Sequence, residues 1–181
     1  MNNALTSNFP ERYIFGFCHR PYSEIREAKA KFIFTFVRNP WDRILSLYSF
    51  WKGQDKSHRH YKFDKAQVDF IEKNKTTFQE FVRHISDRHP LFMQKRHPHP
   101  YIGYFFPDPS YVDFIGRVET YQSDFDRLCE KINITKSCLP VLNKSNHAAY
   151  TKYYDKTTAD IVASLYAEDI EYFGYKFGEQ A

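Results

Sequence analysis

The chain has 181 residues, of which 26 are basic and 22 acidic, so its formal net charge is +4 at neutral pH. This length suits one domain with a sizeable core, and we expect a single domain over residues 1–181. The small positive excess fits an anionic small ligand and is too weak to indicate nucleic-acid binding. Because the sequence has neither a signal peptide nor a long apolar span, we expect a cytoplasmic chain without a membrane-spanning helix.

The first part of the chain is predicted to hold one short strand and one short helix. Residues 1–11 are polar and are expected to form a loop or a frayed end. Residues 13–17 suit a short strand, which delivers His19 to its carboxyl edge. Residues 23–29 begin with a serine that favours the N-cap position, so we expect a helix there.

The next stretch predicts a buried strand, a polar turn and a helix. Residues 32–37 form an almost unbroken apolar run, which is typical of a parallel strand covered on both faces. Asn39 then suits the N-cap position and Pro40 the first helical position. Arg38 would lie at the carboxyl end of the strand beside the helix N-terminus, where α/β folds bind anions; the alternative is an arginine in a salt bridge. Ser46 falls off the apolar stripe of the helix and is available to a ligand.

The middle of the chain is less regular. Residues 52–75 are highly charged without a sustained period, and are interpreted either as a basic substrate loop or as a solvated surface insertion. Thr77 and Glu80 form the pattern of a capping box, which predicts the start of a scaffold helix. Residues 86–110 are rich in proline and predict a long ordered loop.

Two histidine pairs invite a metal interpretation. They are His58 with His60 and His97 with His99. Neither pair has neighbouring cysteines or carboxylates, or the helical spacing of a zinc site. We therefore predict no metal site.

The second half of the chain returns to a regular pattern. Residues 111–116 predict a strand and residues 124–132 a helix. A polar loop at residues 143–147 follows, and then one long helix from Thr157 or Thr158 that ends at Gly174. The alternation of strands and helices predicts an α/β fold with a parallel sheet flanked by helices.

Three stretches resemble one known family. From Arg38 the sequence reads RNPWDRILSLYSF, which resembles the 3′-phosphate-binding motif of the sulfotransferases that use 3′-phosphoadenylyl sulfate (PAPS). The later stretches FIGRVETYQSDFDRLCEKI and LPVLNKSNHAAYTKYYD resemble the carbohydrate-type members of this family. The resemblance covers most of residues 15–178. It implies a P-loop nucleotide-kinase-like fold and transfer of a sulfuryl group from PAPS to a hydroxyl of a carbohydrate, with 3′-phosphoadenosine 5′-phosphate as the product.

The resemblance also implies roles for five residues. Arg38 and Ser46 match the pair that binds the 3′-phosphate in the family. His19 lies in a segment similar to the one that supplies the base for the acceptor hydroxyl, and an imidazole titrates in the range this task needs. Lys144 and Ser145 lie in a late loop similar to the one that closes over the adenosine and the 3′-phosphate.

One family signature is expected upstream of this sequence. It is the Pro-Lys-x-Gly-Thr-type loop that holds the 5′-phosphosulfate, and the sequence begins too late to contain it. We therefore expect an N-terminally incomplete fold, little sulfotransferase activity from this chain alone, and an exposed sheet edge along residues 32–37 that permits self-association. Two alternatives stay open. One is an inactive module that binds a nucleotide or a glycan, and the other is a phosphotransferase, which the lack of a GxxxxGK[ST] sequence disfavours.

Overall fold

The computed structural model describes residues 21–22, 32–58, 60–139 and 148–179. Its contacts divide the chain into two compact units. The strand unit comprises residues 1–38, 101–144 and 181, and the helical unit comprises residues 39–100 and 145–180. Each unit is described by itself, and the single domain expected from the length of the chain stays a prediction. The elements predicted at residues 1–11, 13–17, 23–29 and 143–147 lie outside the described residues.

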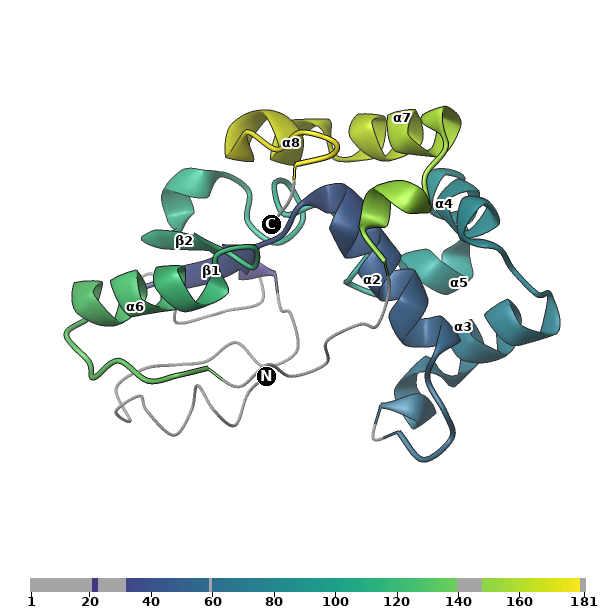
Figure 1. The fold of residues 1–181 in the computed structure, drawn as a ribbon, viewed down its shortest axis with the longest axis horizontal. Coiled ribbons are helices and arrows are strands. Elements are labelled where there is room, and N and C mark those ends of the chain that lie inside the picture. The colour runs from purple at the N-terminus through teal and green to yellow at the C-terminus, as the bar shows by residue number, and fades with distance from the viewer. Residues whose placement is uncertain (1–20, 23–31, 59, 140–147, 180–181) are drawn as a thin grey trace. The chain divides into compact units, whose positions relative to one another are not determined.

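The strand unit contains a small parallel sheet (Figure 1). Strand β1 (Phe34–Val37) pairs in parallel with β2 (Phe114–Arg117), with Val37 opposite Arg117. The predicted parallel sheet is therefore confirmed in part, as two parallel strands in a mixed α/β structure. Both strands are shorter than predicted, because residues 32–33 lie outside β1 and the chain forms the 3₁₀ turn η3 (Pro109–Tyr111) before β2.

Helix α6 (Tyr121–Lys131) packs on this sheet and completes the core of the strand unit. The helix begins three residues earlier than predicted. Its buried face is the predicted one, and it joins apolar side chains of both strands in one cluster. The fully buried members of that cluster are Phe125, Leu128 and Cys129.

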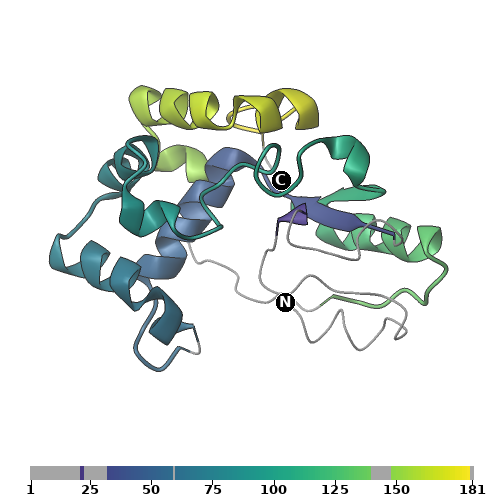
Figure 2. The same cartoon turned by 180° about the vertical axis from the view of Figure 1, so that it is seen from behind.

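The helical unit is organised around α2 (Pro40–Lys52), which contacts most of the other helices of the unit (Figure 2). Asn39 is the N-cap and Pro40 the first helical residue, as predicted. The predicted apolar stripe is buried, and two further side chains are buried beside it. The buried apolar side chains of α2 are Trp41, Ile44, Leu45, Leu47, Tyr48 and Trp51.

The charged stretch at residues 52–75 is not a loop over most of its length. Residues Tyr61–Lys73 form helix α3, so the interpretation as a substrate loop is wrong there, and the interpretation as a surface insertion stays a prediction. The helix buries only a thin face, which consists of Gln67, Val68 and Ile71. Gln67 has no exposed surface, and its amide donates to Leu91 O at 2.7 Å. Because this core position is polar, the apolar residues of α3 do not show a clear helical period in the sequence.

The capping box at Thr77 and Glu80 is confirmed. The backbone N–H of Thr77 donates to Glu80 Oε2 at 2.7 Å, and the Glu80 N–H donates to Thr77 Oγ1 at 3.3 Å. Helix α4 (Phe78–Ser86) begins there and buries its four apolar residues. Helix α5 (Pro90–Met93) is a single turn within the proline-rich segment that was predicted to be a loop.

The predicted last helix is two helices. Helices α7 (Lys156–Leu165) and α8 (Ala167–Phe173) meet at Tyr166, whose φ and ψ are −118° and 28°. Tyr166 is buried and its hydroxyl donates to Pro98 O, so a tertiary contact accompanies the break where the sequence has no glycine or proline.

The predicted start of this helical pair is wrong, and its predicted end is confirmed. The N-cap of α7 is Asp155, whose carboxylate accepts from the backbone N–H of Thr158 at 2.7 Å, rather than either threonine. Gly174 ends α8 as predicted, with a positive φ of 68° that glycine adopts without strain. None of the helices that the structure describes has the length and apolar content needed to cross a membrane.

Candidate functional site

Arg38 directly follows β1 in the strand unit. The last residue of β1 is buried, and its carbonyl Val37 O accepts a hydrogen bond of 2.8 Å from Val118 N. The strand end is therefore held by the neighbouring chain segment, and Arg38 itself is half-buried. A guanidinium at such a position can bind two oxygen atoms of a phosphate group through parallel N–H donors.

Ser46 lies on α2 in the helical unit, between the buried residues Leu45 and Leu47. Its side chain is half-buried, as expected for a residue beside the apolar stripe rather than on it. A serine hydroxyl can donate one hydrogen bond to a phosphate oxygen. Ser46 and Arg38 thus lie on the same continuous strand–turn–helix segment, and belong to different compact units.

The start of α2 is satisfied from within the protein. Asn39 Oδ1 accepts from Trp41 N at 3.1 Å and from Asp42 N at 3.4 Å. These backbone donors therefore have a partner in the N-cap side chain, although free donors at a helix start would favour an anion. Phosphate binding at this turn then depends on side chains more than on the helix N-terminus.

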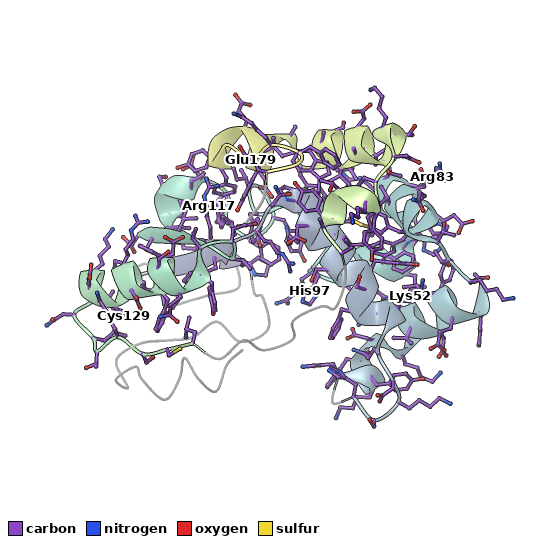
Figure 3. All side chains as sticks on the ribbon, in the orientation of Figure 1. Lys52, Arg83, His97, Arg117, Cys129 and Glu179 are labelled. Atoms are coloured by element: carbon purple, nitrogen blue, oxygen red, sulfur yellow. The ribbon has the colours of Figure 1, made fainter. Side chains whose placement is uncertain are left out.

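A second arginine lies at the carboxyl end of β2, and the sequence interpretation did not include it. Arg117 is opposite Val37 in the parallel register, one residue before the position of Arg38 (Figure 3 labels Arg117). Its backbone N–H donates to Asp124 Oδ2 at 2.7 Å, and Asp124 also accepts from Arg127 Nη1 at 2.9 Å. The parallel register is the signal that could have found it, because adjacent parallel strands bring their carboxyl ends to one edge.

The other three predicted site residues lie outside the described residues. They are His19, Lys144 and Ser145. Their roles therefore stay predictions, as do those of Arg38 and Ser46.

The histidine pairs make contacts with protein groups. The rings of His58 and His60 are 5.6 Å apart between centroids, and His58 also contacts Phe50 at 5.4 Å. His99 Nε2 lies 2.9 Å from Met93 O. Within the described part of the chain, no group of three or more histidine, cysteine, aspartate or glutamate side chains could hold a metal ion.

Comparisons with known proteins agree on one family. Residues 10–176 match the model of the family described as "Sulfotransferase family" (Sulfotransfer_2). Carbohydrate sulfotransferase 14 of Danio rerio is 32% identical over 122 residues, which are 62% of this chain and 33% of that relative. The match therefore spans about a third of the relative's length. A search of solved structures found no match.

Proposed function

This chain belongs to the sulfotransferase family, and we propose that it transfers a sulfuryl group from PAPS to a hydroxyl group of a carbohydrate acceptor. The observation that carries the proposal is the segment from β1 to α2, where Arg38 directly follows the strand and the capped helix carries Ser46. The name of the Danio rerio relative supports a carbohydrate as the acceptor. The proposal includes a P-loop nucleotide-kinase-like fold for this chain. Strand β1 with helix α2, and strand β2 with helix α6, are two strand–helix pairs of such a fold.

Two side chains of this segment bind the 3′-phosphate of the donor. Arg38 supplies a positive charge and directional N–H donors, and Ser46 supplies a neutral donor. This donor set suits a phosphate monoester, because its oxygen atoms only accept hydrogen bonds when ionised. Lys144 and Ser145 follow from the resemblance and would contact the adenosine and the same phosphate. The product 3′-phosphoadenosine 5′-phosphate has the same 3′-phosphate and therefore serves as the test ligand.

His19 has the role of the general base. The imidazole takes the proton from the acceptor hydroxyl while the hydroxyl oxygen forms its bond to sulfur. As this bond forms, the bond between the sulfur of PAPS and its 5′-phosphate oxygen breaks, and 3′-phosphoadenosine 5′-phosphate leaves as an anion. Transfer of this kind depends mainly on positioning and on stabilisation of negative charge, as phosphoryl transfer does.

The central test is the binding of two nucleotides to Arg38→Ala. We expect this variant to lose affinity for 3′-phosphoadenosine 5′-phosphate by about 2 to 3 kcal/mol, because a charge-assisted hydrogen bond is lost. Its affinity for adenosine 5′-phosphate should change little, since that nucleotide has no 3′-phosphate. Titration calorimetry measures both affinities. Ser46→Ala should act in the same direction with a smaller loss.

Matched controls separate this effect from general damage. Arg83→Ala removes an exposed arginine of α4, and Ser49→Ala removes a hydroxyl from the same helix as Ser46. Both should leave the preference for the bisphosphate nucleotide intact. An Arg38→Ala protein that binds the two nucleotides with equally reduced affinity would show that Arg38 does not contact the 3′-phosphate.

The base is tested by turnover. We expect His19→Ala to lower the rate of sulfate transfer roughly 100-fold or more with nearly unchanged nucleotide affinity, because proton removal and nucleotide binding use different groups. Transfer of labelled sulfate to a carbohydrate, in a form of the protein that turns over, measures the rate. Near-normal turnover in a folded His19→Ala protein would remove His19 from the mechanism. Nucleotide binding without any transfer would instead indicate an inactive binding module.

A further inference from the structure

A buried polar cluster lies at the start of α2 in the helical unit. It joins Asn39 to Tyr150 of the short 3₁₀ helix η4 (Tyr150–Lys152) and to the C-terminal residues 176–179. Asn39 is 3% exposed and Tyr150 is 8% exposed. The cluster therefore lies in the interior although it is built from polar groups.

Asn39 uses both ends of its amide. Its Oδ1 accepts from the first backbone donors of α2, as described above. Its Nδ2 donates to Tyr150 Oη at 3.5 Å and to Lys176 O at 3.4 Å. The same side chain thus caps the helix and joins the cap to two distant segments of the chain.

The Tyr150 hydroxyl is equally well used. It accepts from Gly178 N at 2.7 Å and from Asn39 Nδ2, and it donates to Glu179 O at 3.4 Å. A hydroxyl has one hydrogen atom and two lone pairs, and all three have a partner here. Loss of the hydroxyl would leave the Gly178 and Asn39 donors without this acceptor, which is costly for the buried Asn39 amide.

Aromatic packing holds the C-terminal segment against this cluster. The Phe177 ring lies 5.5 Å from Trp41, 5.6 Å from Tyr150 and 5.7 Å from Tyr154, as measured between centroids, and each pair is edge-to-face. The Tyr154 hydroxyl donates to Trp41 O at 2.8 Å. Side chains that are far apart in the sequence therefore surround the first turn of α2, and Glu179 marks the C-terminal segment in Figure 3.

We propose that Tyr150 is a positioning residue for the phosphate site, because through Asn39 it fixes the backbone turn that carries Arg38. The inference rests on the proposed function. Arg38 precedes Asn39 by one peptide bond, and α2 carries Ser46. A rotation of the Asn39 amide would change the turn between β1 and α2, and small displacements of binding groups weaken directional contacts.

The test is nucleotide discrimination by Tyr150→Phe. The measured quantity is the ratio of the affinities for 3′-phosphoadenosine 5′-phosphate and adenosine 5′-phosphate. Loss of the hydroxyl should lower this ratio roughly 3- to 10-fold, the effect of about one neutral hydrogen bond. A residue with only a structural role would lower the thermal stability and leave the ratio unchanged.

Tyr48→Phe is the matched control. It removes a hydroxyl that donates to Thr76 O at 2.8 Å, from a buried tyrosine of α2 in the same unit. We expect a comparable loss of stability without a change in the ratio. A Tyr48→Phe protein with the same fall in ratio would overturn the proposal, because the effect would then be one of general stability.

Asn39→Ser tests the same link by removing the amide instead of the hydroxyl. Serine is a favoured N-cap like asparagine, is neutral and lacks the Nδ2 donor, so the helix start is kept while the donations to Tyr150 Oη and Lys176 O are lost. We expect the ratio to fall as in Tyr150→Phe, and the double variant to lose less than the sum of the two single variants. This variant also serves if Tyr150→Phe does not fold.

The outcomes distinguish the positioning role of Tyr150 from the phosphate-binding role of Arg38. If Arg38→Ala lowers the ratio and both Tyr150→Phe and Asn39→Ser leave it unchanged, the positioning role is wrong and the proposed function stands. If Arg38→Ala also leaves the ratio unchanged, the phosphate site itself is wrong and the positioning role is overturned with it.

Discussion

Gly116 occupies a position in β2 where the structure leaves no room for a side chain. A Cβ atom built on it would lie 2.5 Å from Cε1 and 2.7 Å from Cδ1 of Phe36, its partner on β1. The Phe36 ring is itself packed edge-to-face on Tyr121, with the centroids 4.8 Å apart. The ring therefore cannot move away from Gly116 without disturbing the contact between the sheet and α6.

This crowding leads to a prediction on stability. Gly116→Ala should lower the free energy of unfolding by about 1 to 3 kcal/mol, the usual cost of overpacking a well-packed site. Denaturant unfolding followed by circular dichroism measures it. Phe36→Leu removes the ring, so Gly116→Ala should cost clearly less when introduced into Phe36→Leu. Additive effects of the two substitutions would show that the ring is not the obstacle.

Single residues were predictable from the sequence where their signals are local. Asn39 and Pro40 announce the helix start because capping depends on neighbours within a few positions. The hydrogen bond between Asn39 and Tyr150 joins residues 111 positions apart, and no local sequence pattern predicts a partner so far along the chain. Asp124 was likewise predicted only as the first residue of a helix, and not as the carboxylate that accepts from the backbone N–H of Arg117.

The helices differ in how clearly the sequence marks them. Helices α2 and α4 combine a capping side chain with a dense apolar face, so the sequence predicted both helices. Helix α3 has no side-chain cap at His60 and a thin buried face, and it was missed. The boundary between α7 and α8 was missed for another reason. Tertiary packing of the buried Tyr166 accompanies the change of backbone direction, and helical propensity does not register it.

The contribution of the α4 capping box to stability can be tested by substitution of Thr77. Thr77→Ala should lower the free energy of unfolding by about 1 kcal/mol, because the cap of the Glu80 N–H is lost. Hydrogen bonds from the backbone and the hydroxyl of Thr77 hold the pKa of Glu80 below its ordinary value, so the variant should also lose less stability on acidification than the wild type. This contribution is present above the ordinary pKa of Glu80 and disappears as the pH falls through the lowered pKa.

The control for this variant is Thr157→Ala, at an exposed position in the first turn of α7. The N-cap of α7 is Asp155, so the hydroxyl of Thr157 does not cap this helix. Denaturant unfolding of both variants at neutral and mildly acidic pH gives the comparison. Equal losses in the two proteins would show that the box contributes no more than an ordinary surface threonine.

At the level of the fold, the sequence predicted a parallel sheet with helices packed on it, but not which strands pair. The apolar runs and the helical period carry this information because they reflect burial directly. The division of contacts into a strand unit and a helical unit was not predicted, because the boundary falls between Arg38 and Asn39, within one continuous motif. Arg38 and Ser46 were predicted as a phosphate-binding pair because they match the spacing of a family motif, and this role stays a prediction.

Three tyrosines, of which Tyr150 is buried and Tyr121 and Tyr154 are half-buried, should set the alkaline limit of stability for the protein. Burial raises the pKa of Tyr154 well above its ordinary value of 10.0, and burial also raises the pKa of Tyr150 in the helical unit and of Tyr121 in the strand unit. In the unfolded chain these phenols ionise first, while the folded protein keeps their protons. Their contribution to stability is therefore fully present below about pH 10 and is lost as the pH rises through the raised values.

Tyr154→Phe isolates the largest of these effects. The variant loses the hydrogen bond to Trp41 O, so it should be less stable at neutral pH, and its stability should fall less steeply above about pH 10 than that of the wild type. The denaturant midpoint as a function of pH, read together with tyrosinate absorbance, measures both changes. Tyr172→Phe, at a side chain that is 59% exposed, should keep the wild-type profile. Parallel profiles for Tyr154→Phe and the wild type would show that the Tyr154 hydroxyl does not cause the loss of stability at alkaline pH. Tyr150 would then be the next tyrosine to test, because its ionisation would also disrupt its hydrogen bonds with Asn39 and Gly178.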